Sequence, residues 1–253
     1  LDACLTAMGD ERDRVDIAGR TGLAFFVQVD DVVSPASVSM FPWAARLPAA
    51  LARLGYPSRC FHADATHPLF LHTVERAAQA MADASEQGRP ALVWGVHLPE
   101  FGVVKSLDVS ARQATVSTVL DAHGAATRVT LDELGRSESG QFFALVFGER
   151  VPVDEEDARR ATLLAVLQQG HGQSAGYGHM HAGLLAYDAW CRALETGTID
   201  PAGHAYCAHV FAELRALAPV FLRRLAAQHP AAAEALEQAT AAYRRSADPL
   251  VEL

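Results

Sequence analysis

Two apolar runs near the middle of the chain flank a short turn that carries proton-exchanging side chains. The runs, 91–97 and 102–107, are predicted strands; His97 and Glu100 lie at the turn, and Asp108 closes the second run. Imidazole and carboxyl groups at strand ends can act as general acid and base on a rigid scaffold. We therefore take His97 or Glu100 as a candidate acid–base residue, with Asp108 orienting a partner. An exposed turn, in which Asp108 is a strand-end turn former, explains the same pattern.

Five further residues are candidates for contact with a substrate. Trp94 is either a core residue or a pocket wall. Gln28 is either an oxyanion-type donor or a solvent-facing residue on a half-buried strand. The remaining candidates are Phe101, Tyr177 and His179.

A loop rich in glycine and histidine, residues 170–183, precedes a predicted helix. His171, His179 and His181 could ligate a metal, because imidazole is a common ligand for zinc, copper and nickel. No H-E-x-x-H pattern accompanies them, and no cysteine or carboxylate cluster lies nearby in the sequence. The loop equally fits a flexible connector with incidental histidines, or a lid whose mobility the glycines supply.

Cys4 lies on the first predicted helix and is a candidate nucleophile, because a thiol at a helix start can have a lowered pKa. Burial is the alternative, since cysteine is among the most buried residue types. Cys60 follows a turn and is a weaker candidate, whereas Cys191 and Cys207 lie in predicted C-terminal helices and are expected to be core thiols. Four cysteines without a C-x-x-C pair make no disulfide framework in a chain of 253 residues. The composition therefore predicts reduced thiols and a cytoplasmic, bacterial protein.

The elements that must position these residues begin with helices. Residues 2–9 predict a short helix, followed by a charged loop over 10–14. Thr21–Asp31 is apolar and predicts a strand. Longer helices are predicted over 43–54 and 67–87, each followed by a glycine that can end it.

A block of strands follows, and the chain then becomes helical to its end. The predicted strands are 91–97, 102–107, 114–120, 126–130 and 142–148. Asp154 and the acids after it form a helix N-cap and an acidic first turn. The predicted C-terminal helices are 154–169, 180–195, 203–228 and 230–247.

This order predicts an α+β fold with a central antiparallel sheet, because short polar turns join neighbouring strands. The alternation of a Rossmann fold is absent, and so are the G-x-G-x-x-G and Walker patterns. We expect an α+β core over 1–150 and a helical C-terminal region over 151–253 that packs on it.

Composition narrows the range of partners. The formal net charge is -9 and no basic stripe is visible, which argues against nucleic acid. No apolar run approaches the ~20 residues of a membrane-spanning helix, so we expect no membrane partner. A small-molecule substrate or a carrier-bound acyl group is the expected partner, with homodimerisation left open.

Several short segments, in this order, resemble a known family. They are Gly22-Leu-Ala-Phe25, Arg89-Pro-Ala-Leu-Val-Trp-Gly95, Pro99-Glu-Phe-Gly-Val-Val104 with Asp108, and Gly183-Leu-Leu-Ala-Tyr-Asp-Ala-Trp190. The chain is similar to the butirosin-biosynthesis-H-like group of bacterial proteins, relatives of the papain-like and bacteriocin-processing cysteine peptidases. The resemblance implies a papain-like fold with N-terminal helices, a central antiparallel sheet and a C-terminal helical extension.

The resemblance also implies a catalytic arrangement in which a cysteine on the first helix attacks a carbonyl. A histidine at the start of a strand would be the base, and an aspartate or asparagine would orient it. Cys4 could match the nucleophile, and Glu100 to Asp108 align with the histidine strand. Glu100 or Phe101 stands where the histidine is expected, so the standard Cys–His pair is missing.

Three hypotheses follow. The first is a hydrolase or acyltransferase acting on a small-molecule acyl or amide substrate in natural-product biosynthesis, without a cofactor. Glu100 would replace the imidazole, with His97, Asp108 and Cys4 nearby, if burial raises its pKa. The second is a non-catalytic module that binds a small molecule or a protein on the same fold. The third is a metal-binding protein built on His171, His179 and His181.

Overall fold

The computed structural model describes most of the chain. The described residues are 1–96, 99–119, 121, 126–134, 136, 140–172 and 179–251, with side chains to residue 247. They divide into two compact units, each made of two chain segments. The sheet unit comprises 1–11 and 55–152, and the helical unit comprises 12–54 and 153–253.

The boundaries between the two units fall after Glu11, after Leu54 and after Pro152. Residues 12–54 therefore group with the C-terminal helices. The reason is packing: Gly19 lies so close to Phe221 that a Cβ there would stand 2.2 Å from the ring. The N-terminal segment thus completes the core of the helical unit.

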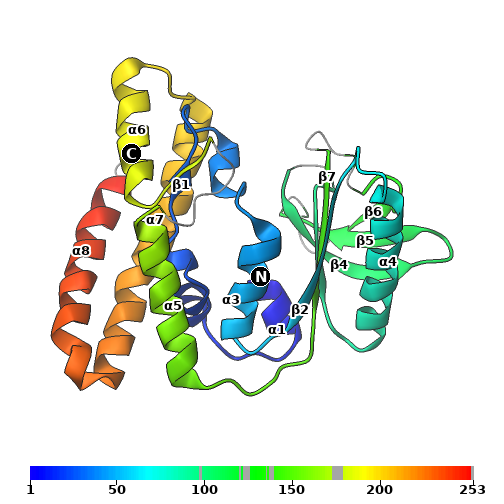
Figure 1. Cartoon of the computed structure of the whole chain (residues 1–253), viewed down its shortest axis with the longest axis horizontal. Coiled ribbons are helices and arrows are strands. Elements are labelled where there is room, and N and C mark those ends of the chain that lie inside the picture. Colours follow the sequence, from blue (N-terminus) through cyan, green and yellow to red (C-terminus); the bar gives the residue numbers. More distant parts are fainter. Residues whose placement is uncertain are drawn as a thin grey trace. The chain divides into compact units, whose positions relative to one another are not determined.

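The sheet unit is built on a six-stranded antiparallel sheet among the described residues, which confirms the predicted α+β class (Figure 1). In spatial order the strands are β2 (Ser58–Asp64), β7 (Gln141–Phe147), β3 (Ala91–Trp94), β4 (Phe101–Asp108), β5 (Gln113–Ser117) and β6 (Thr127–Thr130). Two helices belong to the same unit, α1 (Asp2–Ala7) and α4 (Phe70–Glu86).

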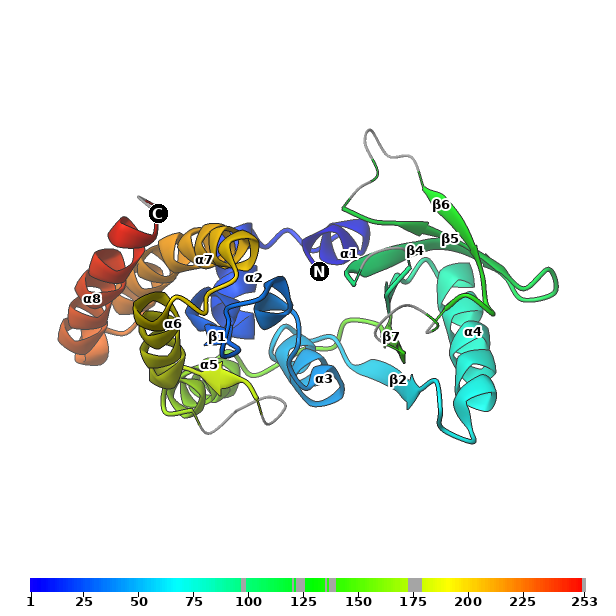
Figure 2. The same cartoon turned by 90° about the horizontal axis from the view of Figure 1, so that it is seen from above.

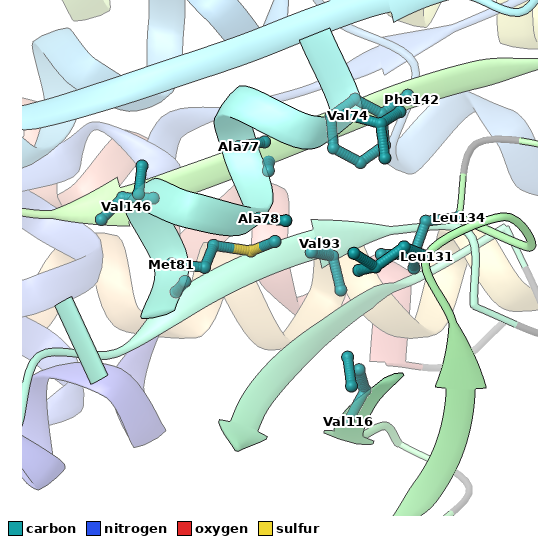
Figure 3. Packing of buried hydrophobic residues seen from close by; sticks show 14 of the residues in the cluster. Val74, Ala77, Ala78, Met81, Val93, Val116, Leu131, Leu134, Phe142 and Val146 are labelled. Atoms are coloured by element: carbon teal, nitrogen blue, oxygen red, sulfur yellow. The ribbon is translucent and has the colours of Figure 1, made fainter. Parts of the chain in front are cut away.

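Helix α4 packs its apolar stripe on one face of this sheet. Val74, Ala77 and Met81 on the helix belong to the same buried cluster as Val93 and Phe142 on the strands, as Figure 3 shows. The alanines let the helix approach the sheet closely. Each large side chain buried there stabilises the unit by about 1.5–3 kcal/mol.

The helical unit contains most of the remaining elements. Its N-terminal part holds α2 (Arg14–Thr21), η1 (Leu23–Phe25), β1 (Gln28–Val29), η2 (Pro35–Val38) and α3 (Trp43–Arg53). Its C-terminal part holds α5 (Glu155–Gly170), β8 (His181–Ala182), α6 (Leu184–Thr196), α7 (Pro201–Gln228), η4 (Pro230–Ala232) and α8 (Ala233–Val251). The short strands β1 and β8 pair antiparallel. Helices α7 and α8 lie side by side, as Figures 1 and 2 show.

The predicted strand Thr21–Asp31 is wrong over most of its length. Gly22, at φ 82°, ends α2, and the chain then forms the 3-10 turn η1 before a two-residue strand. The apolar run is continuous because Phe25 and Phe26 are buried in different clusters of the helical unit. Continuous burial hides the periodicity that separates a strand from a turn.

Helix α7 is the one helix in the described part of the chain with the length and composition of a membrane span. Within that apolar window, 56% is buried inside the protein. Such burial is typical of a core helix, and Arg215 lies on its buried side.

Candidate functional site

The predicted acid–base turn does not bring its carboxylates together. Glu100 immediately precedes β4 and Asp108 ends it. At about 3.3 Å per residue, their Cα atoms lie about 26 Å apart along the strand. The carboxylate of Asp108 accepts hydrogen bonds from Ala111 N at 2.8 Å and from Ser110 Oγ at 2.7 Å. These bonds lower the pKa of Asp108, so it is an ionised turn former. His97 lies outside the described residues.

Cys4 is fully buried on α1. Burial raises the pKa of its thiol, with the N-terminal ammonium and Lys105 opposing the shift more weakly. Burial also raises the pKa of Cys60 to about 11 and that of Cys207 to about 12. A nucleophilic cysteine needs the opposite environment, an accessible thiol with a lowered pKa. Cys191 is exposed.

The aromatic candidates of the sheet unit form core contacts. Trp94 is 1% exposed, and its ring meets that of Phe101 edge-on at 4.9 Å between centroids. Phe101 meets Phe143 in the same way at 6.0 Å. Of the two alternatives for Trp94, core residue or pocket wall, these contacts favour the core.

Gln28 is fully buried, and its amide holds the backbone that follows β1. Its Nε2 donates to Met40 O at 2.7 Å and to Ser37 O at 3.3 Å. The donor capacity that an oxyanion would need is therefore used by carbonyl oxygens. Gln28 positions η2 and the turn after it.

The histidines of the 170–183 loop are dispersed where they are described. His171 caps the C-terminus of α5 and is exposed, as is His179. His181 Nε2 lies 2.8 Å from Asp31 Oδ1. Within the described ranges, no group of three histidine, cysteine or acidic side chains could hold a metal ion. Tyr177 lies in the part of the loop outside the described residues.

A cavity of about 210 Å³ lies instead within the helical unit. It is lined by Phe25, Val27, Gly170, Gly183, Leu184, Tyr187, Arg215, Ala242, Tyr243 and Ser246. These residues come from η1, the segment between η1 and β1, the end of α5, the start of α6, α7 and α8. The walls are mainly apolar, and the polar groups are few.

Gly183 lets these elements converge. Its φ of 63° and ψ of -133° favour glycine, and its N–H donates to Val27 O at 3.1 Å. A Cβ at this position would stand 2.1 Å from Gln169 O and 2.4 Å from Gly170 O. The N-terminus of α6 can approach the end of α5 because Gly183 has no side chain.

Arg215 provides the positive charge of the cavity. It is 2% exposed, its Nε donates to the Tyr187 hydroxyl at 3.1 Å, and its Nη1 donates to Ala24 O at 2.9 Å. The guanidinium also lies over the Tyr243 ring, 5.6 Å from its centroid. Burial raises the pKa of Tyr243, and the charge of Arg215 partly offsets that shift.

No described carboxylate forms an ion pair with this guanidinium. A buried cation without a counter-ion is costly, so buried charges are normally paired. Arg215 has five N–H donors, and the two bonds above use two of them. The N-terminus of α6, which has no side-chain cap, borders the same cavity and adds a partial positive charge. The arrangement can accept an anion.

Sequence reasoning missed this site, although one signal was present. Phe211, Leu214, Ala218 and Leu222 recur at helical spacing and are buried. Arg215 follows Phe211 by four residues and therefore lies on the same apolar face. A lone arginine on a core-facing stripe marks a buried charge that needs a partner.

The fold and the cavity together define an α+β protein with a cationic pocket in its helical unit. Comparison of the chain with protein-family models, with curated proteins and with solved structures gave no match.

Proposed function

We propose that this protein binds a small carboxylate-bearing molecule in the cavity around Arg215. The observation that carries the proposal is a buried guanidinium that lines a cavity and has no carboxylate partner in the described chain. Its three remaining N–H donors can grip both oxygens of a carboxylate. A bound carboxylate would supply the missing counter-ion.

The cavity lining favours a monoanion over a phosphate ester. Arg215 is the sole cation among the described lining residues, and a dianionic phosphate group calls for more positive charge. The cavity is also smaller than the ~300–1,000 Å³ of pockets for drug-sized ligands. The ligand is therefore a compact carboxylate.

The remaining walls describe the rest of the ligand. Phe25, Val27 and Leu184 offer apolar surface, and the Tyr187 and Tyr243 rings add aromatic faces. A short aliphatic or aromatic body bound there would be removed from water at about 25 cal/mol per Å² of apolar area. The class is a short-chain or aryl carboxylic acid. Binding of this kind needs neither a reactive cysteine nor a metal.

Calorimetric titration tests this proposal with pairs of ligands that differ in charge alone. Phenylacetate and butyrate are expected to bind, whereas phenylacetamide and butyramide are not. Arg215→Gln is expected to lose roughly tenfold or more in affinity, since a charge-assisted hydrogen bond contributes about 1.5–3 kcal/mol.

Arg192→Gln is the matched control, because Arg192 is exposed on α6 and does not line the cavity. It is expected to bind like the wild type. Circular dichroism establishes that each variant is folded. Equal binding of acids and amides, or unchanged affinity in folded Arg215→Gln, contradicts the proposal.

A second candidate is the papain-like enzyme implied by the resemblance, acting in the bacterial cytoplasm on acyl or amide substrates. It is favoured by one observation: half-buried Glu100 directly precedes β4, the strand on which the resemblance expects the base. Turnover of small amide and thioester panels tests it. Activity lost in Glu100→Gln but kept in Glu86→Gln, a change at an exposed site, supports it. Rapid alkylation of Cys4 in the native protein would show that its thiol is accessible and reactive, as a nucleophile must be. If neither the loss of activity nor the rapid alkylation is observed, this candidate function is excluded.

A further inference from the structure

A second, larger groove lies elsewhere in the helical unit, with a volume of about 600 Å³. Helix α5 contributes Glu156, Arg159, Arg160, Leu163, Leu164 and Leu167. The end of α7, the η4 turn and the start of α8 form the other wall. Figure 1 shows that the start of α5 and the connection between α7 and α8 lie at the same end of this unit.

The floor of the groove includes two leucine side chains of α5 that are exposed to water. Leu164 is 53% exposed and Leu167 is 59% exposed. Leu163 and Leu236 pack against the core cluster beneath them. Exposed apolar surface that lines a concavity marks a place where a partner or ligand is bound.

Two arginines lie toward one end of the groove. Arg159 and Arg160 precede the leucines on α5, and His229 lies opposite, after α7. Glu156 is the one acidic residue among the described lining residues. The acidic first turn of α5 precedes these arginines, so they stand out by their place beside the leucines and not by a net positive charge of this end.

The guanidinium of Arg159 has hydrogen-bonding capacity that its described neighbours do not use. Its Nη1 donates to Gln228 Oε1 at 3.1 Å, whereas its Nε is buried without an acceptor. Neither Arg159 nor Arg160 forms an ion pair with a described carboxylate. Gln228 holds the Arg159 guanidinium at the head of the groove.

We propose that this groove binds a single-chain anionic amphiphile, a carboxylate with a hydrocarbon tail. The carboxylate lies against Arg159 and Arg160, and the tail lies along Leu163, Leu164 and Leu167. From Arg160 to Leu167 the helix rises about 10 Å at 1.5 Å per residue, enough to separate head from tail.

The one-ended charge distinguishes this occupant from an acidic amphipathic helix of a partner protein. Such a helix repeats its acidic residues along its length and would meet cations along the whole groove. Here the cations precede the leucines on α5, and the described lining beyond them is apolar. The site shares no lining residue with the Arg215 cavity, so the inference does not depend on the proposed function.

Calorimetric titration with decanoate below its micelle concentration tests the proposal on the full chain. In the Arg215→Gln variant, in which the cavity no longer binds carboxylates, decanoate is expected to bind saturably and decyltrimethylammonium at least tenfold more weakly, whereas acetate is expected not to bind. A combined Arg159→Gln and Arg160→Gln variant is expected to lose roughly tenfold in affinity through lost charge-assisted hydrogen bonds. Leu167→Ser changes an exposed residue, is expected to fold, and is expected to weaken decanoate binding.

Arg215→Gln separates this site from the cavity, and it is expected to bind decanoate like the wild type. Three results overturn the proposal: no saturable binding of decanoate, equal binding of the cationic amphiphile, or unchanged affinity in the groove variants. Loss of decanoate binding in Arg215→Gln alone would assign the ligand to the cavity. Binding of an acidic helical peptide but not decanoate would make the groove a protein-docking site.

Discussion

The two units of this protein differ in how a charged side chain finds its partners. In the sheet unit, the carboxylate of Asp108 is satisfied by the turn that contains it. In the helical unit, Arg215 is buried beside a cavity without a described counter-ion. A polar group at a strand end can have a purely local partner. A buried charge that lines a cavity can instead be neutralised by a bound ligand of opposite charge.

The first and largest expected effect concerns Gly183, which lets the cavity form. Gly183→Ala places a methyl group 2.1 Å from Gln169 O and forces an unfavourable backbone conformation. We expect a loss of roughly 2–6 kcal/mol in the free energy of unfolding, as the sum of backbone strain and overpacking. Carboxylate binding at Arg215 should be lost with it. Chemical denaturation and calorimetry measure the two effects.

Gly197→Ala is the matched control at the other end of α6. Gly197 also has a positive φ, 68°, but nothing lies within 4 Å of a Cβ there. It is expected to cost about 1–2 kcal/mol from backbone strain alone and to leave binding unchanged. Equal costs for the two glycine variants would contradict the role given to the close approach at Gly183.

The second effect tests how Arg215 is held. Tyr187→Phe removes the hydroxyl that accepts from Arg215 Nε and leaves a buried donor unsatisfied. The expected cost is about 1–3 kcal/mol of stability. Tyr243→Phe keeps the ring under the guanidinium, so it is expected to stay within about 0.5 kcal/mol of wild type. Thermal denaturation of both variants decides, and a larger cost for Tyr243→Phe contradicts this account.

Much of the fold could be predicted because its signals are local. The cap at Asp154 is confirmed: its side chain accepts from Glu156 N and Asp157 N. The helices expected over 43–54 and 67–87 are α3 and α4, and the strands expected from residue 91 to residue 148 are β3 to β7. Periodicity and terminating glycines act over a few residues, so the sequence reveals them.

The elements that were missed lack such signals. Strand β2 lies at the edge of the sheet, and Ala63 is the one residue in it that is buried. Its sequence therefore lacks the alternation of apolar and polar residues that would predict a strand. Helix α2 has eight residues and buries Ile17, Ala18 and Gly19, too few for a clear stripe. Its docking against Phe221 depends on a contact across two hundred residues of chain.

The cavity could not be predicted for a related reason. Its lining runs from Phe25 to Ser246 and joins five elements that are distant in sequence. The residues that attracted attention, His97, Glu100 and Asp108, are neighbours along the chain. The spacing of residues along a sequence indicates only local structure. A cavity depends on how elements pack together, which residue spacing does not reveal.

The third effect tests the local explanation of Asp108. Asp108→Ala removes both turn bonds and is expected to lower the free energy of unfolding only slightly, because the site is exposed and water competes for these bonds. Ser110→Ala removes one bond and should cost less. Neither change should alter carboxylate binding or turnover. If Asp108→Ala abolished either one while remaining folded, the contrast between the two units would fail.

The smallest effect concerns the ion pair that joins α2 to α7. Arg224 Nη2 lies 2.7 Å from Asp13 Oδ2, and Arg224 Nη1 lies 3.1 Å from Asp16 Oδ1. The hydrogen bond from Arg224 is the main reason why the pKa of Asp13 is lowered from 3.8 to about 2. A carboxyl group whose pKa is lower in the folded state than in the unfolded state stabilises the fold at pH values above its unfolded pKa. This contribution is lost as the pH falls through the folded pKa. Because the pair is exposed, its contribution is at most about 1 kcal/mol.

Arg224→Gln should therefore reduce stability slightly and equally at pH 7 and pH 5, and the difference from wild type should shrink as pH falls from 3.8 toward about 2. Urea denaturation across this range measures it. Arg14→Gln, which breaks the exposed pair with Glu213, is the matched control for loss of a surface charge. A difference that grows as the carboxylates become protonated would contradict the assignment, because protonation can only weaken an Asp13–Arg224 pair. Since this pair ties the N-terminal segment to α7, it is also a test of why residues 12–54 belong to the helical unit.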